Sequence, residues 1–125
     1  MFVIDEDMTI NITRGDTALF ELTATINGES YEFKYNDIVR LSVFAKKNCE
    51  DVVLQKDVRV TADTRTVEIT LDGKDTVIGE VISKPTDYWY EIVLNPDTKP
   101  QTIIGYDDDG AKIFKLFPEG GAINE

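Results

Sequence analysis

Alternation of apolar and polar side chains is the strongest pattern in this chain. In the stretch TALFELTATI, every second residue is apolar: Ala18, Phe20, Leu22, Ala24 and Ile26. Successive side chains of a β-strand point to opposite faces, so this period gives the segment one apolar face and one polar face. A helix would instead repeat its apolar residues about every 3.6 positions. Residues 17–26 are therefore predicted to form a β-strand with one face against a core.

The same alternation recurs along the chain between turn residues. Asn27-Gly28 accepts positive φ at both central positions of a tight turn and predicts a hairpin from the first strand into Tyr31, Phe33 and Tyr35. Further strands are predicted at residues 8–12, 38–46, 52–60, 66–71, 88–94, 101–106 and 111–117. The last two flank DDDG and are expected to form a closing hairpin.

Short strands without a long helical period between them predict an all-β fold. We expect an antiparallel, immunoglobulin-like β-sandwich of about eight strands. At most one short helical turn is expected, within residues 72–84, where Asp72 can cap it before Gly79 and Pro85 end it. Residues 1–118 are predicted to form a single domain, and residues 119–125 a flexible C-terminal tail.

Composition limits the classes of partner. The 125 residues include 13 basic and 24 acidic ones, and the resulting net charge of −11 repels nucleic-acid phosphates and anionic lipid, so we expect no nucleic-acid partner. Cys49 is the only cysteine, which excludes an intramolecular disulfide. The opening MFVIDEDM places acids where an export signal would have an apolar run, and we expect neither a signal peptide nor membrane insertion.

The triplet Arg14-Gly15-Asp16 matches a tripeptide that many adhesion ligands present to receptors. It lies between Ile12, at the end of one predicted strand, and Thr17, at the start of the next. Such a short connection needs a tight bend, and glycine bends at low steric cost. We therefore interpret the triplet as a structural turn.

Candidate catalytic and metal-binding groups are few. The chain contains no histidine, which excludes serine–histidine and cysteine–histidine catalysis. The densest acidic groups are Asp5-Glu6-Asp7, Glu50-Asp51 and Asp107-Asp108-Asp109. We interpret them as solvated loops, because calcium loops space their acids at alternate positions and three consecutive aspartates point in different directions. No catalytic residue, metal or cofactor is predicted.

The aromatic stretch YWYEI and the strand edges are the candidate binding features. If Tyr88 and Tyr90 face the core, Trp89 faces the other way, where it packs under a loop, joins a protein interface or stacks on a sugar. Unpaired edges of an open sandwich can accept a partner strand, and we place them at residues 8–12 and 102–117. The candidate interface residues are Trp89, Ile10, Ile12, Ile103, Phe114 and Phe117.

Several of these segments, in order, resemble small β-domains encoded among tail and baseplate genes of phages and prophages of Gram-positive bacteria. The chain is most similar to the N-terminal domain of upper baseplate proteins. The matching positions are Gly15-Asp16-Thr17 at the start, Asp75-Thr76 before the crossover, and the strand from Tyr88 to Ile92. The stretch EVISKPTD, residues 80–87, is longer than that family leads us to expect.

This resemblance implies a non-enzymatic structural or adaptor component of a virion. Its partners would be other virion proteins, in a homo- or hetero-oligomer, and it would be made in the bacterial cytoplasm and incorporated into the particle. Because no receptor-binding or trimerising segment follows the domain, we expect an adaptor without its own host-recognition module. The alternatives are a stand-alone carbohydrate- or ligand-binding β-sandwich and, third, an enzyme with a carboxylate site.

Overall fold

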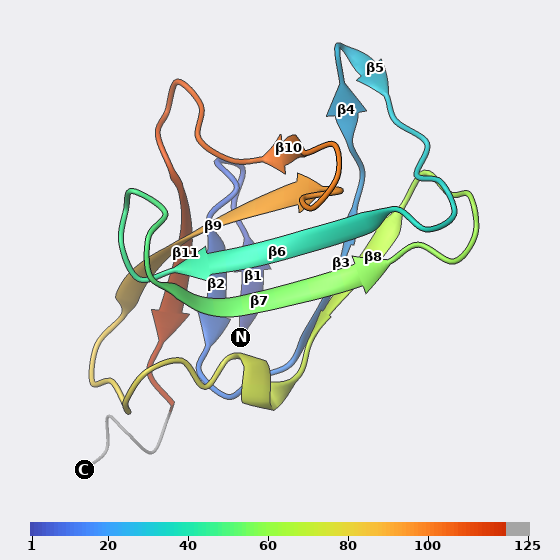
Figure 1. Ribbon diagram of the computed structural model, residues 1–125. Coiled ribbons are helices and arrows are strands. Elements are labelled where there is room, and N and C mark those ends of the chain that lie inside the picture. The colour runs from blue at the N-terminus through green and yellow to red at the C-terminus, as the bar shows by residue number, and fades with distance from the viewer. Residues whose placement is uncertain (120–125) are drawn as a thin grey trace.

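The protein, described here by a computed structural model for residues 1–119, is built almost entirely of β-strands (Figure 1). One short 3₁₀ helix, η1 (Gly73–Asp75), interrupts them. The strands are β1 (Phe2–Ile4), β2 (Ile10–Thr13), β3 (Ala18–Leu22), β4 (Thr25–Ile26), β5 (Glu29–Ser30), β6 (Ile38–Phe44), β7 (Val52–Arg59), β8 (Val67–Leu71), β9 (Thr86–Leu94), β10 (Gln101–Ile104) and β11 (Lys112–Phe117). No helix in residues 1–119 is long and apolar enough to cross a membrane.

The larger sheet contains seven strands, and six of them follow the order β1-β2-β11-β9-β6-β7. The seventh, β10, pairs with the end of β9 from Ile92 to Leu94. Since β6 occupies one edge of β9 over residues 89–94, β10 and β11 share the other edge. Only β2 and β11 run parallel among the paired strands of residues 1–119.

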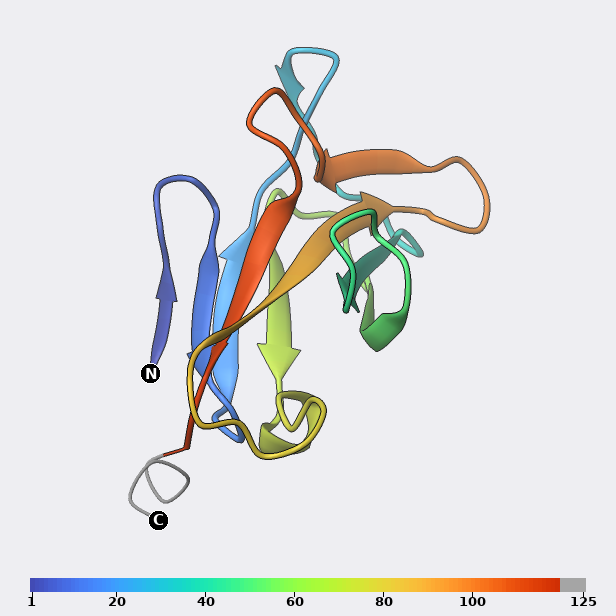
Figure 2. The same ribbon diagram turned by 90° about the vertical axis from the view of Figure 1, so that its left-hand side faces the viewer.

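A second layer is formed by β3 and β8, which pair antiparallel with Ala18 opposite Leu71 and Leu22 opposite Val67. In Figure 2 these two strands lie behind β11 and β9 of the larger sheet. The core fills the space between the layers because each strand directs its alternate apolar residues inward. The largest fully buried side chains are Tyr90, Phe33, Phe114, Ile10, Ile12, Leu41, Ile69, Leu71, Ile92 and Leu116.

The all-β class and the helix prediction are confirmed. The helical segment η1 lies within residues 72–84 and is a single turn. Asp72 precedes it in extended conformation, and its amide donates a hydrogen bond to Asp75 at 2.8 Å. The Asn27-Gly28 turn is also confirmed, with φ of +53° and +80° at the two residues. Left-handed values at both positions fit the tight hairpin that joins β4 to β5.

Two strand predictions are wrong in part. The strand expected over residues 17–26 is divided, since β3 ends at Leu22 and the chain then leaves β8 to form the separate β4–β5 hairpin. The segment expected to continue that hairpin leaves it after two residues. Phe33 instead forms two backbone hydrogen bonds with Thr64, one donated by the amide of each residue. A short-range pattern does not reveal such a long-range partner.

The prediction of a closing hairpin also needs correction. Strands β10 and β11 each pair with β9 and not with one another, because β11 inserts between β2 and β9. The strand β1 was not predicted at all. Glu119, expected in the flexible tail, accepts a hydrogen bond from Arg14 at 2.6 Å. Residues 120–125 of the expected tail lie outside the described part of the chain.

Candidate functional site

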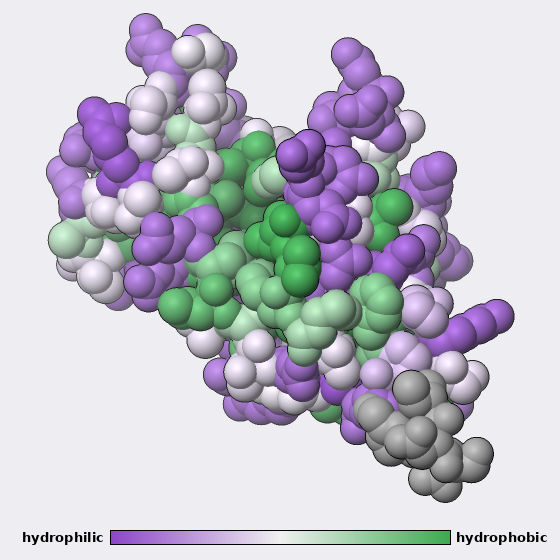
Figure 3. All heavy atoms as spheres, turned by 180° about the vertical axis from the view of Figure 1, so that it is seen from behind, coloured by the Kyte–Doolittle hydropathy of each residue, from purple (hydrophilic) through white to green (hydrophobic). Residues whose placement is uncertain are grey.

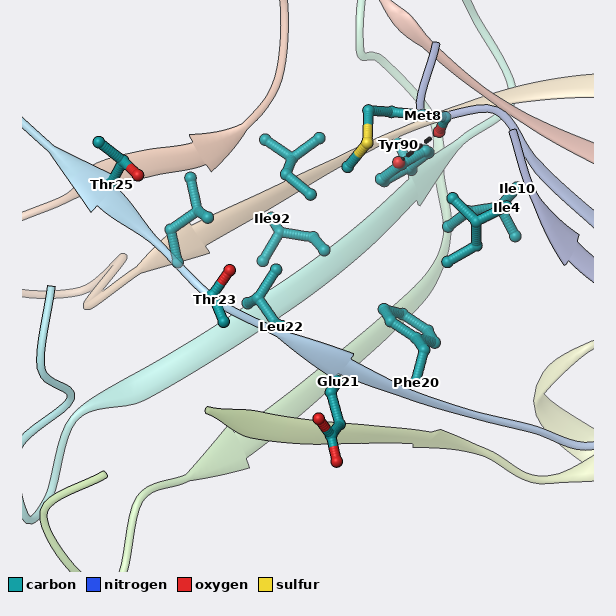
Figure 4. Close-up of a pocket in the computed structure, with 12 residues that line it drawn as sticks. Ile4, Met8, Ile10, Phe20, Glu21, Leu22, Thr23, Thr25, Tyr90 and Ile92 are labelled. Carbon is teal, nitrogen blue, oxygen red and sulfur yellow. Dashed lines mark hydrogen bonds between the residues drawn. The ribbon is translucent and has the colours of Figure 1, made fainter. Parts of the chain in front are cut away.

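A cavity of about 300 Å³ opens where the two layers part, beside β3 (Figure 4). Its walls come from the β1–β2 hairpin, from β3 and the segment leading to β4, and from β9 and β10. The lining residues are Ile4, Met8, Ile10, Phe20, Glu21, Leu22, Thr23, Thr25, Tyr90, Ile92, Ile103 and Ile104. Most of these side chains are apolar. Figure 3 shows hydrophobic residues gathered across the middle of the rear face of the molecule, with hydrophilic residues above them.

The edge of β3 borders this cavity. The consecutive residues 20–23 all line it, although neighbouring side chains of a strand point to opposite faces. Figure 4 shows the Phe20 side chain directed to one side of the strand and the Glu21 side chain to the other. Within residues 1–119, β3 pairs with β8 alone. One edge of β3 is therefore unpaired and lies next to an apolar cavity.

Two side-chain contacts hold the walls of the cavity. The rings of Phe2 and Phe20 stack with centroids 5.8 Å apart, which joins β1 to β3 next to the cavity. The Tyr90 hydroxyl donates a hydrogen bond to the carbonyl of Met8 at 2.6 Å. Burial raises the pKa of Tyr90, so the hydroxyl keeps its proton and remains a donor at neutral pH. Met8 itself has a φ of +71°, a conformation that few non-glycine residues adopt.

The surface around β3 is acidic. Glu21 lies directly opposite Glu68 in the β3–β8 ladder, and both side chains are exposed. Like charges in this position destabilise a sheet. Neither glutamate forms an ion pair with a residue in the described part of the chain. The turn between β1 and β2 adds the exposed acids of residues 5–7 near Met8.

Three predicted interface residues are in the core instead. Ile10, Ile12 and Phe114 are at most 1% exposed. Strand β2 is paired on both edges over residues 10–12, by β1 and β11, and β11 is paired on both edges over residues 114–116, by β2 and β9. The expectation of an unpaired edge is therefore wrong for residues 10–12 and 114–116, whereas β10, at residues 101–104, pairs with β9 alone within residues 1–119.

The other predicted interface residues are partly buried. Trp89 lies on the outer face of β9, opposite Ile113 of β11 and Phe44 of β6. It is packed among these neighbours and does not stand free of the surface. Ile103 lines the cavity beside β3, and Phe117 ends β11. Of the six candidates, only Ile10 and Ile103 contribute to the cavity, and Ile10 does so from the core.

The Arg14-Gly15-Asp16 triplet is a structural turn. Arg14 is 8% exposed, and its guanidinium donates to the carbonyl of Gly79 at 2.8 Å and to Glu119 at 2.6 Å. Gly15 has a φ of +88°, which glycine adopts readily. Asp16 forms an ion pair with the N-terminal amine of Met1. An arginine held in this way is not available to a receptor.

The acidic loop at residues 107–109 forms a tight turn. Asp107 accepts a hydrogen bond from the amide of Asp109 at 2.9 Å and pairs with Lys112 at 2.7 Å. The hydrogen bond from Lys112 lowers the pKa of Asp107. Over the described residues, the side chains of His, Cys, Asp and Glu form no group of three that could hold a metal ion.

No protein-family model, curated protein or solved structure matches the chain. Its functional interpretation therefore depends on the geometry described above and on the resemblance noted in the sequence. The cavity beside β3 was not predicted. Alternating residues indicate which face of a strand is buried, but they do not indicate which of its edges is paired.

Proposed function

We propose that the chain is a non-enzymatic structural or adaptor component of a phage or prophage virion, in the tail or baseplate, that acts through protein–protein assembly. The observation that carries this proposal is the unpaired edge of β3 beside an apolar cavity. The resemblance of the sequence to baseplate β-domains suggests the setting, and the edge supplies a means of assembly.

Unpaired edges are sites of strand addition unless the sequence protects them, and charged residues are the usual protection. Strand β7 carries Lys56, Asp57 and Arg59 along its length. Strand β3 reads ALFEL and has a single charge, while its Leu19 is 58% exposed on the outer surface. This contrast disfavours β7. Strands β1, β8 and β10 also have an unpaired edge and at most one charge, and what favours β3 as a contact with another protein is the cavity that its consecutive residues 20–23 line.

A ligand-binding β-sandwich is the second candidate, and the same cavity favours it. A volume of about 300 Å³ is at the lower end of the range for small-molecule sites, which are mostly apolar with a few polar groups. Here the polar lining residues are Glu21, Thr23, Thr25 and Tyr90. Because Trp89 is partly buried between Ile113 and Phe44, a sugar-stacking platform at that position has less support.

The virion role is tested by expressing the chain together with its neighbouring genes, or by inducing the phage, and analysing purified particles by mass spectrometry. We expect the chain in the particles at a fixed ratio to other tail proteins. Consistent absence from particles, together with tight binding of a small molecule in the cavity, would favour the ligand-binding candidate instead. An unrelated cytoplasmic protein measured in the same samples controls for carry-over.

A further inference from the structure

We propose that the free edge of β3 accepts an extended segment of another protein, in which apolar residues alternate with lysine or arginine. The segment adds to β3 as a new strand. This inference rests on the proposed assembly function and names the class of partner for it. It depends on three features of β3: its unpaired backbone, the cavity under it and the uncompensated acids on its outer face.

The backbone of β3 supplies the first feature. In an antiparallel ladder, each strand directs alternate amide and carbonyl groups toward each of its two edges. Strand β8 takes one edge of Ala18–Leu22, and no other strand in residues 1–119 takes the second. The groups on that second edge can bond a strand that lies about 4.8 Å away. Such main-chain bonds give affinity with little dependence on sequence.

The cavity determines the side chains that the added strand directs inward. Phe20 and Leu22 are the inward residues of β3 at this point, and the cavity continues past them to Ile92 and Ile103. A neighbouring strand places its own inward residues at the same level as those of β3. The inward positions of the partner are therefore apolar, because the surrounding wall is mostly aliphatic and aromatic.

The outer face determines the charge of the remaining positions. Glu21 and Glu68 face one another there without a cationic partner in residues 1–119. A lysine or arginine on the added strand would lie next to Glu21 and relieve the repulsion between the two glutamates. Its aliphatic stem would cover the exposed Leu19. The exposed acids of residues 5–7, near the opposite wall, favour the same sign of charge.

A second copy of this chain fits the site less well. The protein has a net charge of −11, so two copies repel one another as they approach. If a second copy supplied its apolar edge strand β1, the three acids that follow β1 at residues 5–7 would come close to the acidic face of β3. A basic segment from a different protein is therefore the better complement.

The inference is tested with a synthetic peptide of alternating lysine and valine, titrated into the isotopically labelled protein and followed by NMR. A matched peptide has glutamate in place of each lysine. We expect amide shifts confined to β3 and the lining of the cavity, and slower hydrogen exchange in β3. We also expect roughly tenfold weaker binding of the glutamate peptide, and weaker binding of the lysine peptide in high salt. Two further forms of the lysine peptide carry N-methyl groups on the backbone amides of one strand edge or of the other. Only the form methylated on the edge that pairs with β3 should lose binding.

Charge reversal in the protein identifies the site. The double substitution Glu21→Lys and Glu68→Lys should reverse the preference, so that the glutamate peptide binds more tightly. The control is Glu50→Lys with Glu80→Lys, which makes the same change in net charge at exposed positions away from the cavity. It should leave the lysine peptide preferred. The thermal unfolding of each variant confirms that it is folded.

Three results would overturn the proposal: no shift at β3 up to millimolar peptide, protection at β1 or β7 in place of β3, or equal effects of the two double variants. Particle analysis separates this failure from that of the virion role. If the wild-type chain enters particles and the Glu21→Lys, Glu68→Lys variant enters equally well, the β3 site is wrong and the virion role stands. If the wild-type chain is absent from particles, the virion role fails whatever the peptides do.

Discussion

The backbone amide of Gly15 donates a hydrogen bond to the hydroxyl oxygen of Thr76 at 2.9 Å, and that hydroxyl donates to the carbonyl of Asp16 at 2.8 Å. The turn after β2 is thereby attached to the segment after β8. These residues belong to two of the three motifs on which the resemblance to baseplate domains depends. Their contact gives both motifs a structural role, because Thr76 is fully buried and satisfies backbone groups from the other turn.

The first prediction concerns this contact. Thr76→Val keeps the shape of the side chain but leaves the amide of Gly15 and the carbonyl of Asp16 without their partner. We expect a loss of about 1 to 3 kcal/mol in the free energy of unfolding, measured by urea denaturation. Thr70→Val, at an exposed position of β8, is the control and should change stability by less than about 0.5 kcal/mol. Equal effects of the two substitutions would contradict the structural role.

The second prediction concerns Gly73, where the backbone of Gly15 lies too close to leave room for a side chain. A Cβ atom at this position would lie 2.8 Å from the carbonyl oxygen of Gly15, a backbone atom that cannot move aside without shifting the turn. We expect Gly73→Ala to destabilise the protein by about 1 to 3 kcal/mol. Lys74→Ala, at the next and exposed position of the same helical turn, should be close to neutral. Thermal unfolding of the two variants side by side makes the comparison.

The third prediction concerns the Arg14-Gly15-Asp16 triplet. Because Arg14 is buried, the wild-type protein should not support integrin-dependent cell adhesion, and Asp16→Glu should have no adhesion to remove. Gly15→Val should instead cost about 1 to 3 kcal/mol of stability, since φ at this residue is +88°. A plate adhesion assay and chemical denaturation measure the two effects. Specific adhesion that depends on Asp16 would refute the first part.

The fourth prediction is a dependence of stability on pH. Burial by itself raises the pKa of Asp75, but the hydrogen bonds from Lys56 at 2.8 Å and from the amide of Asp72 outweigh it, and the net pKa is below the ordinary value of 3.8. A carboxyl group with a lowered folded pKa stabilises the protein above its unfolded pKa, and this contribution is lost as pH falls through the folded value. At pH 7, Asp75→Asn should therefore cost about 1 kcal/mol.

The difference between wild type and Asp75→Asn should shrink as the pH falls from about 4 through the lowered folded pKa of Asp75, because the wild-type carboxyl is progressively protonated over that range. Urea denaturation at several pH values measures it. Asp63→Asn is the control, at an exposed position where the carboxylate accepts a hydrogen bond from the amide of Tyr35. A penalty for Asp75→Asn that stays constant down to pH 2 would show that the charge of the carboxyl is not the cause.

The fifth prediction concerns calcium. Since Asp107 is already paired with Lys112, the acidic turn should not bind the ion tightly. Micromolar calcium should leave the melting temperature unchanged within about one degree. A rise of many degrees that Asp108→Ala abolishes would count against this prediction.

Much of the fold could be predicted from the sequence because burial in a sheet follows a local period. The inward residues of β8, Val67, Ile69 and Leu71, are buried as the alternation predicts. Pairing is a different matter. The strand β11 inserts between β2 and β9, whose residues lie far away in the chain, and no local pattern specifies those neighbours.

The candidate site shows the same limit. Phe114 and Ile12 are apolar and belong to predicted edge strands, yet both became core residues once β11 acquired a neighbour on each side. Glu21 lies between the apolar residues of the alternating stretch 17–26, which predicts that it is on the polar face, and its side chain is exposed. Its proximity to Glu68 depends on the register of β3 against β8, which is not encoded in the residues around either glutamate.

The position of β11 has a consequence for synthesis of the protein. The parallel pairing of Phe114 with Ile10 and of Leu116 with Ile12 joins the second strand of the described residues 1–119 with their last strand. A nascent chain that has emerged only as far as β10 can pair β6 with β9, but it leaves the apolar edge of β2 without its neighbour. Folding of the larger sheet during translation therefore cannot be completed before β11 has left the ribosome.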